Sequence, residues 1–242
     1  MVAAVSVGFA KTAVNGTGAV SAALFALILP ARESTGALLP LLLVGDLVAI
    51  GLYRQHTNWA VIRRLLPWVA VGIVGGAAYV ASVGDGGMRR SIGLLLLVLV
   101  AVQLLTRGSR AQSLLGDPGD GPMRVGHRAA AAVVGVAAGF ATMVANASGA
   151  VMTVYLLLSG MAMMEFLGTN AWFFLIVNLL KLPFSIGLGL VAPGALLLDL
   201  ALVPALAAGA VGGVLIVRRI HQQMFERVAL ALVGTSAGLL FL

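Results

Sequence analysis

The chain contains no cysteine and few charged residues. Charged side chains make up 10% of its 242 residues, and the three histidines, His56, His127 and His221, fall between the apolar runs. The lack of cysteine excludes disulfide bonds, thiolate catalysis and cysteine-based metal sites. Histidines that lie only in loops argue against a histidine metal site within the apolar runs. We therefore expect no metal and no other cofactor.

The scarcity of charge leaves a chain that is too apolar for a soluble domain. Hydrophobic residues make up 61% of the sequence, and the mean hydropathy is +1.09. A soluble domain needs more polar residues to cover its exterior, whereas ~18–20 apolar residues suffice to cross a bilayer. The sequence predicts an all-α polytopic membrane protein. After a first apolar run near the start, further runs lie at Ala37–Leu52, Leu65–Val83, Ile92–Thr106, Ala129–Ser159, Phe166–Ala192, Leu196–Val217 and Val228–Leu242.

The net charge of +7 comes mainly from arginines that lie between the apolar runs. In a soluble protein this charge would suggest nucleic acid as a partner. In a membrane protein, loop arginines determine which side of the bilayer a loop occupies. We therefore expect the lipid bilayer as the surroundings and no nucleic-acid partner. No cleavable signal peptide is evident, because no basic segment precedes the first apolar run.

An internal repeat divides the sequence into two halves. The stretch GFAKTAVNGTGAV at Gly8–Val20 recurs as GFATMVANASGAV at Gly139–Val151, with 7 of 13 positions identical. A second pair, Pro67–Gly76 and Pro204–Gly213, matches at 6 of 10 positions in the same order. We expect residues 1–106 and 128–242 to form two transmembrane repeats of four apolar segments each, joined by a cytoplasmic linker at residues 107–127. Duplication of this kind is typical of transporters, although a duplicated helical bundle without a transport role would show it too.

The loop charges favour a re-entrant first segment in each half. If all eight segments cross, seven Lys and Arg residues lie on one side and six on the other. If the first segment of each half dips in, breaks at its asparagine and returns, the division becomes ten against three, as the positive-inside rule requires. The arms of the first hairpin, near Val2–Val14 and Thr17–Leu29, would each be ~20 Å long, too short to cross a ~30 Å hydrocarbon core. This scheme predicts inverted halves, each opening with a broken or re-entrant helical hairpin.

The repeated motifs are candidates for an anion site. A broken backbone within the membrane is tolerated only where protein or a water-filled cavity surrounds it. The glycines permit a turn, and the helix that follows directs its N-terminal dipole at the break. Asparagine and glycine could instead serve only helix packing, but a matched pair of motifs favours a site near the midplane. The candidate binding residues are Asn15, Gly16, Thr17 and Gly18 in the first half and Asn146, Ser148 and Gly149 in the second.

Three ionisable residues, Lys11, Asp46 and Lys181, lie within apolar runs. Charges at such depth are costly and commonly functional. Lys11 lies one helical turn before Asn15, so we add it and Lys181 to the candidate anion site. Asp46 corresponds to Asn178 in the other half, and these two are candidates for coupling, with Asp46 binding and releasing a proton during transport. The alternatives are that the lysines extend to the membrane interface and that Asp46 only pairs with a lysine.

Taken together, these motifs resemble the TauE/SafE family of sulfite exporters. The resemblance rests on GF-x(5)-N-x-x-G-A in each half, the paired Pro-x(4)-Gly-x-x-Gly-Gly segments, four apolar segments per half and an arginine-rich central loop, and it covers nearly the whole chain. It implies a multi-pass protein of the plasma membrane of a bacterium or archaeon that transports sulfur-containing anions such as sulfite, sulfoacetate or related organosulfonates. The second motif has Ala147 where the first has Gly16, so the two half-sites differ.

The predicted function is a secondary transporter that exports a small sulfur-containing anion. An anion channel, an uptake system for sulfate or thiosulfate, and a non-transporting structural subunit are the alternatives. The sequence contains no nucleotide-binding loop, so ATP drive by this chain is unsupported. An intramembrane enzyme would need a nucleophile and base or metal ligands, and only a speculative pairing of Ser148 with Lys11 would provide them. We therefore expect no enzymatic activity, while assembly into a homo-oligomer stays open.

Overall fold

The chain folds into a helical bundle. A computed structural model describes residues 1–13, 29–107, 128–191 and 193–219, together with the single residues 21, 25, 221 and 224. Every regular element within these ranges is helical, which confirms the predicted all-α fold. The elements are α1 (Val2–Thr12), α3 (Ala31–Tyr53), the 3-10 turn η2 (Arg54–His56), α4 (Trp59–Ser82), α5 (Asp85–Arg107), α7 (Arg128–Ala145), α8 (Ser148–Leu158), α9 (Met163–Gly187) and α10 (Pro193–Val217).

Four of these helices contain segments that are long and apolar enough to cross a membrane, namely Arg32–His56, Trp59–Ser82, Met163–Gly187 and Asp199–Val217. Large apolar side chains on the spans point outward; Leu47 is 60% exposed, Val71 57% and Leu200 70%. Such outward apolar faces suit contact with lipid, because the exposure of large apolar patches to water is unfavourable. The chain is thus an integral membrane protein. The last predicted apolar run, Val228–Leu242, lies outside the described residues.

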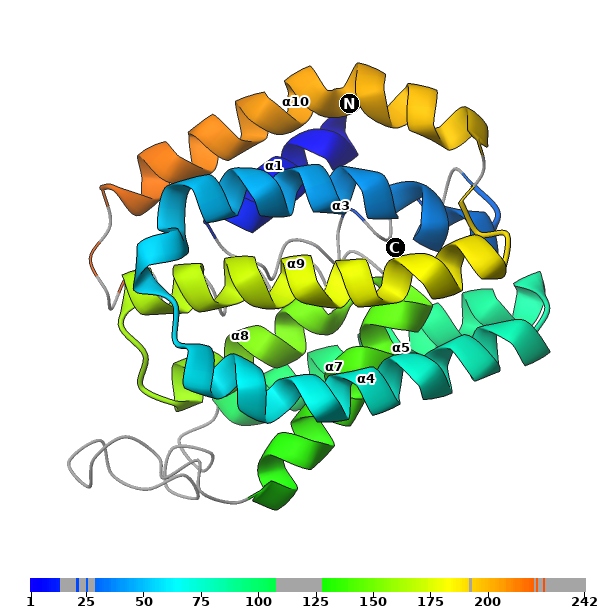
Figure 1. Cartoon of the computed structure of the whole chain (residues 1–242), viewed down its shortest axis with the longest axis horizontal. Helices are drawn as coiled ribbons and strands as arrows, with labels where there is room; N and C mark the ends of the chain where they lie inside the picture. The colour runs from blue at the N-terminus through cyan, green and yellow to red at the C-terminus, as the bar shows by residue number, and fades with distance from the viewer. Residues whose placement is uncertain are drawn as a thin grey trace.

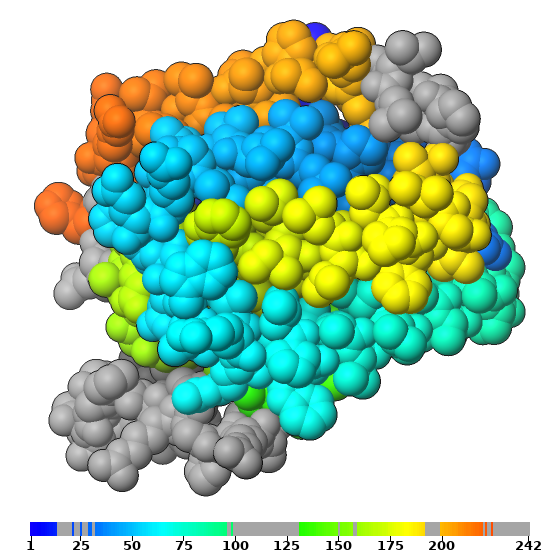
Figure 2. Space-filling model, viewed as in Figure 1, coloured from blue at the N-terminus to red at the C-terminus, as the bar shows by residue number. Residues whose placement is uncertain are grey.

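The long helices run roughly parallel to one another across the molecule (Figure 1). Their colours show that α3 and α10 run from right to left in this view, whereas α4 and α9 run from left to right. Helix α1 lies against α10 and α3, and α7 lies against α4. The atoms of α3 and α9 meet side by side on the face shown in Figure 2. The interface between α3 and α9 is therefore central to the bundle.

Two pairs of helices approach closely at glycines. A Cβ atom on Gly8 of α1 would collide with the Leu206 carbonyl of α10, and one on Gly209 of α10 would collide with the Val5 carbonyl of α1. Likewise, Gly139 of α7 and Gly72 of α4 each face the backbone of the other helix. Small residues allow such backbone contact between membrane helices. Gly8 and Gly139 hold the same place in the two copies of the first motif, and Gly72 and Gly209 hold the same place in the second.

Polar contacts join the N-terminal ends of helices α4 and α9. The Asn58 side chain caps α4 by accepting a hydrogen bond from the Val61 backbone N–H at 3.3 Å, as expected for an N-cap residue. The Asn58 amide nitrogen also donates to Glu165 Oε1 at 2.7 Å, and its backbone N–H donates to Thr169 Oγ1 at 2.9 Å. These contacts hold the start of α9 against the turn that precedes α4.

Candidate functional site

The second motif breaks the helix where the sequence predicts. Helix α7 ends at Ala145, and α8 begins at Ser148. Between them Asn146 adopts a left-handed conformation with φ of 51°, which asparagine tolerates better than most residues. Its backbone N–H donates to the Thr142 carbonyl at 3.1 Å, and the Ala147 N–H donates to the Ala141 carbonyl at 3.2 Å. The last turn of α7 is thus closed by backbone hydrogen bonds.

The Asn146 side chain joins this break to two other helices. Its Nδ2 donates to the Thr35 carbonyl of α3 at 3.0 Å. Its Oδ1 accepts a hydrogen bond from Lys181 Nζ of α9. Thr35 and Lys181 are buried, whereas Asn146 itself is half-buried. Asn146 therefore positions a lysine beside the N-terminus of α8, where the helix dipole adds further positive potential.

Lys181 is held by neutral acceptors. Its side chain is 1% exposed, and its ammonium donates to the Thr142 carbonyl at 3.1 Å as well as to the Asn146 side chain. The lysine thus points into the protein rather than to the membrane interface. The contacts of this ammonium with described residues are all to dipoles. Dipoles alone compensate a buried charge poorly, so the ammonium favours an anionic ligand.

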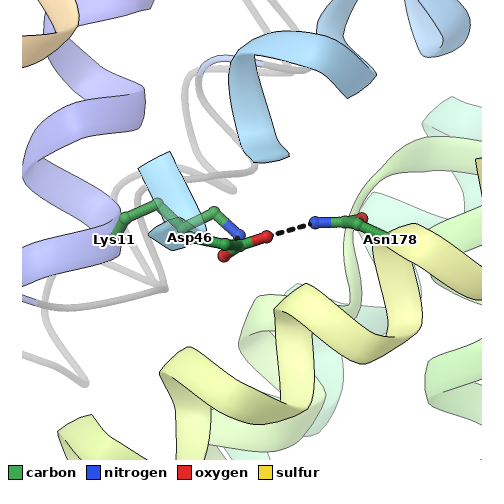
Figure 3. Close-up of polar contacts among 3 residues, drawn as sticks. All are labelled: Lys11, Asp46 and Asn178. Carbon is green, nitrogen blue, oxygen red and sulfur yellow. Dashed lines mark hydrogen bonds and ion pairs between the residues drawn. The ribbon is translucent and has the colours of Figure 1, made fainter. Parts of the chain in front are cut away.

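Lys11, Asp46 and Asn178 form a second polar cluster (Figure 3). Lys11 Nζ of α1 lies 2.6 Å from Asp46 Oδ1 of α3, and Asn178 Nδ2 of α9 donates to Asp46 Oδ2 at 2.7 Å. The Lys11 ammonium also lies 4.5 Å from the centre of the Phe174 ring, a distance suited to a cation–π interaction. Lys11 therefore remains inside the protein, and Asp46 has the lysine partner that was one of its two sequence interpretations.

The two clusters meet at a small cavity. Its volume is about 20 Å³, and its lining includes Lys11, Asn146, Ser148, Gly149, Phe174 and Asn178. A space of this size holds roughly one water molecule, which is smaller than a sulfite or sulfonate group. The site is therefore closed in this conformation, and a bound anion would need its walls to separate.

The structure brings most of the predicted site residues in its described ranges together. Lys11, Asn146, Ser148, Gly149 and Asn178 line the cavity, Asp46 contacts two of them, and Lys181 reaches Asn146. The first-half candidates Asn15, Gly16, Thr17 and Gly18 lie outside the described residues.

Sequence reasoning missed Phe174 and the carbonyl groups of Thr142 and Thr35. Phe174 stands in a continuous apolar run, so nothing in the sequence distinguishes it from a residue that faces lipid. Every residue has a carbonyl group, so no sequence signal identifies those that accept from Lys181 or Asn146. One clue to the Thr142 carbonyl was present in the sequence. A helix break expected at Asn146 leaves the last carbonyl groups before it without partners inside the helix, so that they can accept from other groups.

A larger hollow of about 620 Å³ lies elsewhere, against α4, α5 and α7. Its lining is apolar and includes Trp68, Leu95 and Phe140. The described residues that line it include no charged side chain, and their one side-chain hydrogen-bond donor is the Trp68 indole N–H. We therefore place the candidate site at the small polar cavity instead. Within the described part of the chain, no group of three or more histidine and acidic side chains is arranged to hold a metal ion.

The chain matches one family of known proteins. A family model described as sulfite exporter TauE/SafE matches residues 1–240, which is nearly the whole chain. Comparison with curated proteins found no match, and comparison with solved structures found none either.

Proposed function

The chain belongs to the TauE/SafE sulfite exporter family, and from this membership we propose that it is a secondary transporter that exports a small sulfur-containing anion, such as sulfite or an organosulfonate. The observation that carries the proposal is the buried Lys181 ammonium beside the helix break at Asn146. A positive side chain next to a helix N-terminus inside a membrane protein suits an oxyanion.

In this proposal the anion takes the place of the neutral acceptors of Lys181. In the closed conformation the Lys181 ammonium donates hydrogen bonds to the Thr142 carbonyl and to Asn146 Oδ1. An oxyanion would accept the same hydrogen bonds with a favourable charge, and the Ser148 side chain and the first amides of α8 would supply further donors. The closed cavity of about 20 Å³ then corresponds to a state without substrate, and opening it to one side admits the anion.

We propose that the two halves are inverted repeats and that their relative movement opens the site to alternate sides. Helices α3 and α9 hold the same place in the two halves and run in opposite directions, as do α4 and α10 (Figure 1). The equivalent glycines of the two halves make equivalent contacts across the repeat. Asp46 and Asn178, which also correspond, contact each other directly, as residues close to a two-fold axis would. Inverted repeats commonly alternate access by rocking around a midplane site.

The proposal also gives a role and an orientation to the rest of the chain. The motif Asn15–Gly18 would supply the second break, opposite that of Asn146, to complete the anion site. The linker at residues 107–127 and the other arginine-rich loops would face the cytoplasm, following the ten-to-three division of basic residues. The membrane would be the plasma membrane of a prokaryote.

The test is anion flux through liposomes that contain the purified protein. Sulfite, sulfoacetate, thiosulfate and sulfate are each loaded, and efflux is compared with that from protein-free liposomes. We expect flux of at least one of these anions, and we expect Lys181→Met to reduce it strongly. Arg63→Met, which removes an exposed positive charge, is the matched control and should transport like the wild type. Equal flux in protein-free and protein-containing liposomes for all four anions would contradict the proposal.

A further inference from the structure

We propose that the ion pair between Lys11 and Asp46 sets the net charge of the anion site, so that the transporter selects substrates with one negative charge over substrates with two. This inference rests on the proposed function, because it concerns the charge class of the same anion. It assigns Asp46 as a specificity-determining residue that does not itself contact the anion.

The charge balance of the site follows from its contacts. Lys11 and Asp46 are both buried, and their charged atoms lie 2.6 Å apart, so their charges compensate each other. Among the described residues, Lys181 donates to a carbonyl group and an amide oxygen, and no described acidic side chain forms an ion pair with it. Residues 14–28, which carry the first-half motif, contain no ionisable side chain. Counted over the described residues and residues 14–28, the site therefore carries one uncompensated positive charge.

Other buried charges of the described residues do not alter this balance. Asp199 of α10 is also buried, but it does not line the cavity. The other described groups at the cavity are neutral and include the Ser148 hydroxyl, the Asn178 amide and the Phe174 ring. Helix α8 adds only the partial charge of its N-terminus, which is about half an elementary charge.

A buried site strongly discriminates between one and two charges. A monoanion beside Lys181 gives a neutral assembly, whereas a dianion leaves one negative charge without a partner. In an interior that excludes water, an uncompensated charge is costly. The geometry thus favours a sulfonate of single charge by at least roughly tenfold in transport efficiency, the change that a modest difference in binding free energy produces.

Replacing Asp46 with asparagine changes the charge while keeping the shape. Asp46→Asn retains an oxygen that can accept from Asn178, but it leaves Lys11 without an acidic partner. The site would then carry two positive charges, and a dianion would become the matched ligand. We therefore expect this substitution to shift selectivity towards dianions rather than to reduce the transport of all anions equally.

The experiment compares flux of methanesulfonate and sulfate in liposomes. Methanesulfonate carries one charge and sulfate carries two, and neither changes charge over the working pH range, unlike sulfite. Ethanesulfonate and sulfoacetate form a second pair, in which the dianion has an added carboxylate. We expect the wild type to prefer the monoanion of each pair by at least roughly tenfold, and we expect Asp46→Asn to lower or reverse this ratio. Asn178→Ser, which removes the amide partner of Asp46 without changing charge, should keep the ratio whatever its effect on rate.

A wild type that transports sulfate as well as methanesulfonate would overturn the inference, even if Asp46→Asn failed to fold. An Asp46→Asn variant that transports with the wild-type ratio would overturn it as well. Transport of sulfite by a protein that shows either result would leave the proposed function intact. Absence of flux for every sulfur-containing anion would overturn the proposed function and this inference with it.

Discussion

Lys11→Met is expected to destabilise the protein more than any other single change at the polar clusters. The substitution keeps the length and apolar stem of the side chain but removes the ammonium that lies 2.6 Å from the fully buried Asp46. Removing one partner of a buried ion pair leaves an uncompensated charge and costs about 3–5 kcal/mol in the free energy of unfolding. Asn178 would remain as the amide donor to Asp46, so the lower part of this range is the better expectation.

Removing the acidic partner of the ion pair instead should lower the free energy of unfolding by less. In Asp46→Asn the Lys11 ammonium keeps the face of the Phe174 ring at 4.5 Å, and a desolvated cation–π contact contributes about 2 kcal/mol. In Lys11→Met/Asp46→Asn both charges are absent, so neither partner is left buried as an uncompensated charge. The double variant should therefore be more stable than Lys11→Met.

The assay is reversible unfolding of the four proteins in one detergent, followed by circular dichroism and arranged as a double-mutant cycle. We expect a coupling free energy between positions 11 and 46 of at least about 2 kcal/mol. Losses that simply add, with Lys11→Met costing less than about 1 kcal/mol, would refute the reasoning, because they would mean that the pair is exposed to water or is not formed.

Three further predictions address packing, topology and coupling. Gly139→Ala should lower the free energy of unfolding by about 1–3 kcal/mol, because the new Cβ would meet the backbone of α4, whereas Gly75→Ala on that helix meets nothing within 4 Å and is the control; equal stability of the two variants would contradict the close crossing. Cysteines introduced at Val2 and Arg32 should both react with an impermeant reagent from outside, and labelling from opposite sides would restore eight simple crossings. Flux measured against pH should lose its pH dependence in Asp46→Asn if this carboxylate exchanges a proton during transport; unchanged rate and pH profile would make Asp46 structural.

The membrane-spanning helices could be predicted because such helices are recognisable in sequence by their length and apolar composition. The spans at α3, α4, α9 and α10 correspond to apolar runs that were visible in the sequence. The break at Asn146 was also predictable, because asparagine and glycine inside an apolar run favour a left-handed turn. The contacts of these helices could not be predicted in detail, because apolar residues that face lipid and those that face protein look alike in sequence.

The contacts within the polar site could not be predicted from the sequence. Lys11 and Asp46 were recognisable as costly charges in apolar runs, but their separation along the chain does not reveal that they meet. The sequence left interface exposure of the lysines open, and the structure places Lys11 and Lys181 inside the bundle with partners. Phe174 and the Thr142 carbonyl became apparent only from tertiary packing.

The central claim is that Lys181, beside the break at Asn146, binds the transported anion. The most direct measurement is the equilibrium affinity of the purified protein for sulfite, in the wild type and in Lys181→Met. A hydrogen bond to a charged group contributes about 1.5–3 kcal/mol, so we predict that the substitution weakens binding by roughly 10- to 150-fold. Sulfite that binds Lys181→Met as tightly as it binds the folded wild type would contradict the account.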